Sequence, residues 1–120
     1  MQYLLLIYEA DDVMQNMSPD DRQAVMSGYQ AFTRDIRKSG HFQAGEALDP
    51  VTAATSVRIR DGKTLVTDGP FAETPIAETP IAETKEQLGG YYLVEAAAIA
   101  ARIPTAKTGT IEVRPIMVWD

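Results

Sequence analysis

The chain has 120 residues, the usual size of one domain, and its 45% apolar and 23% charged content is that of an ordinary globular protein. A formal net charge of −6 argues against nucleic-acid binding, because phosphate recognition needs clustered Lys and Arg. With no cysteine, disulfides and thiolate chemistry are excluded, and a single histidine offers no imidazole cluster for zinc or iron. We therefore expect a single domain over residues 1–120, with no metal and no cofactor.

The first segment, QYLLLIYEA at residues 2–10, is a short apolar run bounded by acidic residues. Such a run is typical of a strand buried on both faces, so we expect it to be the central strand. No basic segment precedes it, and no apolar run in the chain approaches the roughly 20 residues of a membrane helix. The sequence thus predicts a cytoplasmic protein that does not enter a membrane.

Residues 18–39 have the pattern of an amphipathic helix. Ser18 suits the N-cap, Pro19 suits the first helical position, and Gly40 stands where a left-handed residue would follow the last turn. Apolar side chains recur at helical spacing along one face. They are Val25, Tyr29, Phe32 and Ile36. We expect this stripe to pack on the sheet.

The remaining segments are predicted to be mostly strands. HFQAGEAL reads as a strand, and residues 54–67 as a hairpin with the two-residue turn Asp61-Gly62. Residues 68–90 are rich in Pro, Gly and acidic residues and are predicted to form a long loop. After the loop we expect a strand at 91–96, a short helix at 96–104 that ends at its proline, and a final strand at 109–119.

This order of elements predicts an α+β fold, a split β-α-β plait in which two helices cover one face of an antiparallel sheet that carries an added hairpin. The two helices leave the other face of the sheet uncovered. A second copy of the chain is the simplest cover for that face. We therefore predict a symmetric homodimer that packs sheet to sheet.

The predicted loop contains the unit Pro-x-Ala-Glu-Thr three times in succession, over residues 70–84. A five-residue unit with one apolar position cannot stack a solenoid core, which needs repeats of about 20 residues. Doubling the length of a surface loop costs only about 0.6 kcal/mol, so a tolerated duplication is favoured over a recognition element. The repeat is expected to matter mainly through how the loop closes over a cleft.

The run LVTDGPFAET joined to KEQLGGYYLVEA resembles the signature of the DGPF proteins, a branch of the YCII-related family. YLLLIYE, SGHFQAGEALDP, TSVRIRDGK and GTIEVRPIM extend the resemblance over the whole chain. It implies a ferredoxin-like fold that forms a dimeric α+β barrel, with a cleft near the dimer interface. The family pattern lacks residues 75–84, has a longer second helix, and places the histidine of its His-Asp pair near Tyr29.

The first candidate catalytic residue is Asp68, because a carboxylate before Gly-Pro at a strand end can be held by the turn and directed into an open edge of the sheet. The alternative is structural, since Asp-Gly-Pro also makes a good turn in which the Asp accepts backbone N–H groups. The neighbouring Gly69, Pro70 and Phe71 are candidates for substrate binding. Phe71 can stack on a ligand, or it can simply anchor the loop.

Two tyrosines are candidates at the cleft. Tyr29 can donate a proton or hold a substrate oxygen as the catalytic partner of Asp68, although an aromatic residue on a helical stripe is usually core with its hydroxyl at the rim. Tyr8 and Glu9 end the first strand and are expected to line the same cleft.

Glu46 and His41 complete the set of candidate substrate-binding residues. Glu46 lies between small and apolar residues, where burial would raise its pKa as a general base requires. An ion pair with Arg58 or Arg60 across the sheet is the alternative, and it is slightly favoured. His41 follows the helix end at a junction where an exposed position is expected.

Two functions remain open at the level of sequence. One is a cofactor-independent enzyme that performs acid-base chemistry on a small organic molecule in the cleft. The other is a non-catalytic regulatory module with a protein partner, because DGPF proteins are similar to modules found beside extracytoplasmic-function sigma factors. The absence of an obvious nucleophile argues against covalent catalysis and leaves both open.

Overall fold

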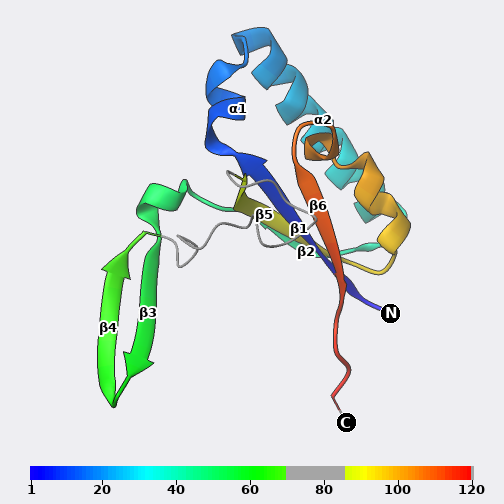
Figure 1. Ribbon diagram of the computed structural model, residues 1–120. Coiled ribbons are helices and arrows are strands. Elements are labelled where there is room, and N and C mark those ends of the chain that lie inside the picture. Colours follow the sequence, from blue (N-terminus) through cyan, green and yellow to red (C-terminus); the bar gives the residue numbers. More distant parts are fainter. Residues whose placement is uncertain (70–85, 120) are drawn as a thin grey trace.

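A computed structural model describes residues 1–69 and 86–119 of the chain (Figure 1). The strands are β1 (Tyr3–Ala10), β2 (Phe42–Ala47), β3 (Thr55–Arg60), β4 (Lys63–Asp68), β5 (Glu86–Val94) and β6 (Thr110–Pro115). The α-helices are α1 (Asp11–Asn16) and α2 (Pro19–Lys38), and the 3-10 helices are η1 (Val51–Ala53), η3 (Ala97–Arg102) and η4 (Pro104–Lys107).

The main sheet has the strand order β2-β5-β1-β6, with every neighbouring pair antiparallel. This order is that of a split β-α-β plait and is compatible with a ferredoxin-like fold. The predicted α+β class and the central place of β1 are confirmed.

One face of the main sheet packs against the helices. Leu5 and Ile7 of β1 are buried there, whereas Leu4 and Leu6 on the opposite face are half-buried. The predicted burial of β1 on both faces therefore holds, within a single copy, only for the helix side. The core comprises Leu5, Ile7, Phe32, Ile36, Tyr92, Val94, Ile99 and Ile103, from β1, α2, β5, η3 and the residue that joins η3 to η4.

Helix α2 begins and ends as its sequence predicts. The Oγ atom of Ser18 accepts a hydrogen bond from the backbone N–H of Asp21 at 3.1 Å, and Pro19 occupies the first turn. Gly40 follows the helix with φ of +79°, a conformation that glycine adopts without strain. Local capping interactions therefore set where α2 begins and ends.

The predicted hairpin is present as a separate two-stranded sheet of β3 and β4, which projects from the body of the molecule (Figure 1). Its turn residues Asp61 and Gly62 both have positive φ, 52° and 74°, as a two-residue turn between twisted strands requires.

Two expectations are corrected, and one helix, α1, is additional to the predicted elements. β5 begins at Glu86, so residues 86–90 belong to a strand and not to the predicted loop. Their polar and glycine-rich sequence is not typical of a strand. The side chain of Glu86 accepts a hydrogen bond from Thr110. α1 was not predicted, because six mostly polar residues give no periodic signal. The predicted second helix is made of 3-10 turns, and Pro104 begins η4. The repeats at 70–84 lie outside the described residues.

Candidate ligand-binding cavity

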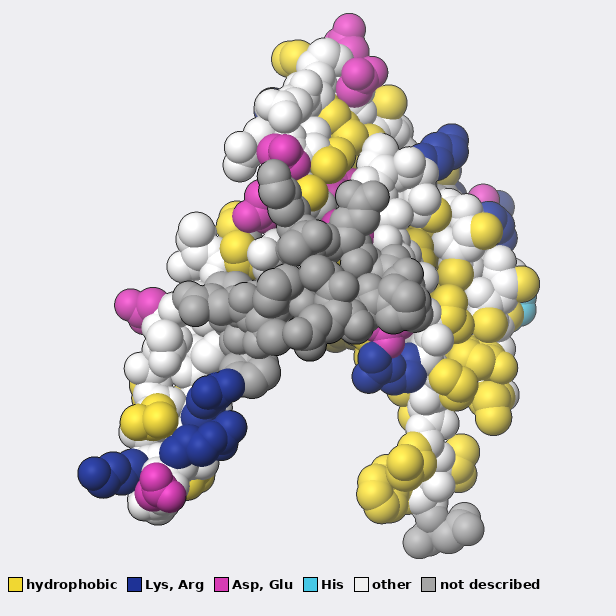
Figure 2. Space-filling model, in the orientation of Figure 1, with side chains coloured by type: hydrophobic (Ala, Val, Ile, Leu, Met, Phe, Trp, Pro, Cys, Tyr) yellow, Lys and Arg dark blue, Asp and Glu magenta, His cyan; other side chains and the backbone are white. Residues whose placement is uncertain are grey.

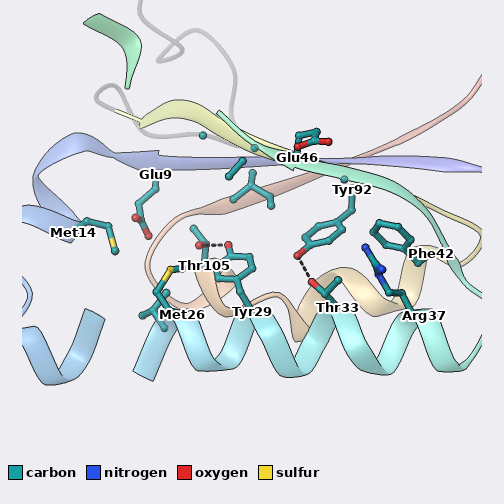
Figure 3. A pocket seen from close by; sticks show the side chains of 16 residues that line it. Glu9, Met14, Met26, Tyr29, Thr33, Arg37, Phe42, Glu46, Tyr92 and Thr105 are labelled. Atoms are coloured by element: carbon teal, nitrogen blue, oxygen red, sulfur yellow. Dashed lines mark hydrogen bonds between the residues drawn. The ribbon is translucent and has the colours of Figure 1, made fainter. Parts of the chain in front are cut away.

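A cavity of about 360 Å³ lies between α2 and the main sheet (Figure 3). Its walls come from β1, α1, α2, β2, β5 and η4. The lining residues are Ile7, Glu9, Met14, Val25, Met26, Tyr29, Thr33, Arg37, Phe42, Gly45, Glu46, Ala47, Gly89, Gly90, Tyr92 and Thr105. The volume falls in the range of small-molecule sites, and the walls are mostly apolar.

The cavity is not filled by side chains, because glycine residues form the part of the sheet that borders it. Gly45, Gly89 and Gly90 form part of its wall. A Cβ atom on Gly45 would lie 2.7 Å from Cδ1 of Tyr92, and one on Gly90 would lie 2.9 Å from a backbone oxygen of β2. Glycine at these positions lets the Tyr92 ring lie close against β2 and leaves space between the sheet and α2 unfilled.

Two pairs of hydroxyl groups join α2 to the opposite side of the cavity. The Tyr29 hydroxyl lies 2.5 Å from Oγ1 of Thr105, and the Tyr92 hydroxyl lies 2.8 Å from Oγ1 of Thr33 (Figure 3). In each pair either oxygen can be the donor. The ring of Tyr92 is further held edge-on to Phe32, with centroids 5.2 Å apart. These hydroxyl oxygens are therefore polar groups held at defined positions in a mostly apolar wall.

Tyr29, a predicted site residue, lies in this cavity. Burial raises its pKa above the usual 10.0, while the hydrogen bond with Thr105 lowers it in part and the nearby Glu9 carboxylate raises it slightly. The phenol therefore keeps its proton at neutral pH. It can donate a hydrogen bond to a ligand, but it cannot serve as a base there.

Besides Tyr29 and Tyr92, three ionisable residues line the cavity, and two of them, Glu9 and Arg37, have side chains on the side of the sheet that faces α2. Glu9 extends from β1 toward Tyr29 and Thr105 (Figure 3). Arg37, in the last turn of α2, holds its guanidinium carbon 4.6 Å above the ring centroid of Phe42. Glu9 was expected to line a cleft with Tyr8 and Asp68, and it lines a cavity that neither of those residues borders.

Asp68 and Gly69 lie elsewhere. Asp68 ends β4, is exposed, and does not line the cavity. The backbone N–H of Gly69 donates to the carbonyl of Ala54 at 2.7 Å, and its carbonyl accepts from Oγ of Ser56 at 2.8 Å, so the turn is tied to the hairpin. A single copy of the chain therefore does not bring Asp68 and Tyr29 together. Pro70 and Phe71 lie outside the described residues.

Tyr8 and His41 also lie outside the cavity. The Tyr8 hydroxyl donates to Glu112 at 3.3 Å, and burial together with that carboxylate raises the pKa of Tyr8. Alternation along β1 places Tyr8 on the face opposite α2. Nδ1 of His41 lies 2.9 Å from Oγ of Ser39 at the end of α2.

Glu46 borders the cavity, but its carboxylate lies on the side of the sheet away from α2 (Figure 3). It is exposed, so the burial expected of a general base is absent. Its expected partners Arg58 and Arg60 belong to the other sheet, so no pairing across one sheet is possible.

Sequence reasoning did not identify Thr33, Arg37, Tyr92 or Thr105 as site residues. A signal existed for two of them, because Thr33 and Arg37 follow Tyr29 by four and eight positions and so share its face of the helix. The sequence gave no such signal for Thr105 and Tyr92, since their positions relative to α2 depend on how segments distant in the chain pack together.

Within residues 1–69 and 86–119, no group of three or more His, Cys, Asp or Glu side chains is arranged to hold a metal ion. None of the helices in that part of the chain is long and apolar enough to cross a membrane.

The fold and the cavity define a small α+β domain with a helix-on-sheet pocket. The chain matches the YCII-related domain over residues 1–78 and 74–120, and the two matches overlap within the repeated segment. It is 33% identical to an uncharacterized protein of Rhizobium meliloti (strain 1021), over 99% of this chain and 94% of that protein. The chain therefore belongs to the YCII-related family.

Proposed function

We propose that this protein binds a small organic molecule in the cavity between α2 and the main sheet. The observation that carries the proposal is a cavity of about 360 Å³ whose mostly apolar walls contain two hydroxyl pairs and a half-buried, protonated Tyr29. This site lies on the helix side of the sheet, away from the face on which we expect a second copy to pack.

Acid-base catalysis at this site would rest on Tyr29 as the proton donor. The cavity contains the Glu9 carboxylate as a possible base, in place of the predicted Asp68. Glu9 accepts a hydrogen bond from Oγ1 of Thr108 at 2.7 Å, which orients it. Ligand binding is therefore the primary proposal. Catalysis would require a ligand whose transferable proton lies between the Tyr29 hydroxyl and the Glu9 carboxylate.

A thermal-shift screen with small carboxylic acids, phenols, lactones and amines tests the proposal. A ligand at a hundred times its Kd adds about 2.7 kcal/mol to the free energy of unfolding, which raises the unfolding midpoint measurably. We expect hits that weaken in Tyr29→Phe and persist in Asp68→Asn. Hits lost in Asp68→Asn and unchanged in Tyr29→Phe would contradict a site in this cavity.

A second candidate function, protein interaction, is favoured by the hairpin. Val57, Ile59 and Val66 lie on one of its faces and are 63%, 66% and 64% exposed. Arg58, Arg60 and Lys63 gather on the hairpin, alternating with them (Figure 2). A two-stranded hairpin is marginally stable alone, so a partner that covers the apolar face would stabilise it.

We infer that the partner is a second copy of the chain, which also covers the outer face of the main sheet. Half-buried Leu4, Leu6, Tyr91 and Leu93 lie on that face. Sedimentation equilibrium should give twice the chain mass for the wild type and a lower mass for Ile59→Lys. A monomeric wild type would contradict the homodimer, and a dimeric Ile59→Lys would exclude the hairpin from the interface.

A further inference from the structure

The cavity has a charged side chain of opposite sign at each end. Glu9 lies at the end bounded by Met14 and Met26, and Arg37 lies at the end bounded by Phe42 (Figure 3). Tyr92 stands between the two ends. The site is thus electrically asymmetric along its length, and its middle carries no charged side chain that points toward α2, only apolar groups and the two hydroxyl pairs.

Neither charge is neutralised by the part of the chain that the structure describes. Among residues 1–69 and 86–119, no basic group lies within ion-pair distance of Glu9 and no acidic group within that of Arg37. Glu9 has a neutral donor in Thr108, at 2.7 Å, and Arg37 has the face of Phe42. A ligand can therefore supply the oppositely charged partner at either end.

The spacing of the two charges sets the length of a ligand that would satisfy both. Figure 3 places Glu9 near the level of Met26 on α2, and Arg37 is eleven positions further along that helix. At 1.5 Å per residue, the two levels are about 17 Å apart, which the side chains can shorten by bending toward each other. An α-amino acid is too short to reach both groups.

We propose that the cavity takes an elongated zwitterion, with an amine at Glu9, a carboxylate at Arg37, and an apolar chain between them along Tyr92 and the glycine wall. Glu9 is half-buried and Arg37 is exposed at the mouth of the cavity. A ligand with one charge would make a charge-assisted contact at one end only, and would therefore bind less tightly than a ligand that makes both contacts. The guanidinium of Arg37 presents paired donors that suit a carboxylate. This inference rests on the proposed function and specifies its ligand class.

The test is isothermal titration calorimetry at low salt with four probes of one chain length. These are 8-aminooctanoic acid, octylamine, octanoic acid and octanol. We expect the wild type to bind 8-aminooctanoic acid at least tenfold more tightly than any of the other three. The advantage over octanoic acid should disappear in Glu9→Gln, and the advantage over octylamine should disappear in Arg37→Met, which keeps an apolar stem on Phe42.

Matched controls separate charge recognition at the cavity from general electrostatics. Arg34→Met and Glu95→Gln remove exposed charges that do not line the cavity, and the tenfold preference should survive both. Binding of octanol as tightly as 8-aminooctanoic acid would overturn the zwitterion while leaving a cavity that binds apolar molecules. No binding by any of the four probes would count against the proposed function itself.

Discussion

The apolar stripe of α2 has two halves that face the same sheet, yet only one of them is buried. In the second half of the stripe, Phe32 and Ile36 meet Leu5, Tyr92 and Val94 and are buried. In the first half, Val25 and Tyr29 are half-buried and line a cavity that also extends along α2 as far as Arg37. An apolar stripe on a helix thus predicts that the helix packs on a sheet. The sheet residues opposite the stripe determine whether a packed core or a binding cavity forms there.

The largest expected effect comes from breaking the packed half. Ile36→Ala should lower the free energy of unfolding by about 2–5 kcal/mol, because Ile36 is fully buried and its truncation leaves a void. Val25→Ala is the matched change in the open half. It should cost less than about 1 kcal/mol, because Val25 already borders empty space.

Urea denaturation of both variants measures this difference. Equal losses at the two positions would mean that the two halves of the interface are packed alike in solution.

The second effect concerns the glycine wall. Gly45→Ala should destabilise the protein by about 1–3 kcal/mol, because the new Cβ would lie 2.7 Å from Cδ1 of Tyr92 and would push the ring toward the cavity. Gly89→Ala is the control, since its Cβ would meet nothing closer than 3.9 Å. Unfolding midpoints and near-ultraviolet circular dichroism should change in the first variant alone; the same response in both would remove the special role of Gly45.

The smallest effect lies in the hydroxyl groups. Tyr29→Phe should cost about 1 kcal/mol near neutral pH, because the hydrogen bond with buried Thr105 is lost. The raised pKa of Tyr29 means that the folded state holds the phenol proton more tightly than the unfolded chain does. That stability is complete below pH 10 and is lost as the pH rises through the folded-state pKa.

Urea unfolding midpoints at pH 8 and pH 11 test whether stability falls as the pH rises through the folded-state pKa of Tyr29. The wild type should lose more stability over this interval than Tyr29→Phe does. Tyr8→Phe is the control outside the cavity: its pKa is also raised, so it should reduce the alkaline loss as well, but without changing ligand binding. An alkaline loss in Tyr29→Phe as large as in the wild type would show that Tyr29 does not contribute to it.

Local signals made much of the fold predictable. Ser18 and Gly40 bound α2, and Asp61-Gly62 sets the hairpin, because capping and turn geometry act within a few residues. The chain order of strands and helices then admits few topologies. Glu86 escaped prediction because its burial depends on Thr110, which lies 24 positions away in the sequence.

The site was harder to predict than the fold. Tyr29 and Glu9 were predicted to line a cleft with Asp68, and both line the cavity between α2 and the sheet, where Asp68 is absent. Asp68 stood out in the motif but belongs to the hairpin. The opening opposite Val25 depends on strand register, including the irregularities in the pairing of β5 with β1 and β2, and register is fixed by tertiary packing.

The glycine wall has a consequence for how this pocket can diversify. Because backbone atoms form that wall, a side chain added at Gly45 or Gly90 would clash within the sheet. Such substitutions would lower stability and would not simply change which ligand the cavity prefers. The side chains free to vary stand on α2, at the positions of Met26, Thr33 and Arg37. A laboratory library directed at those three positions would change ligand preference on an unchanged scaffold, and inherited variation among relatives should follow the same division between a fixed sheet and a changeable helix.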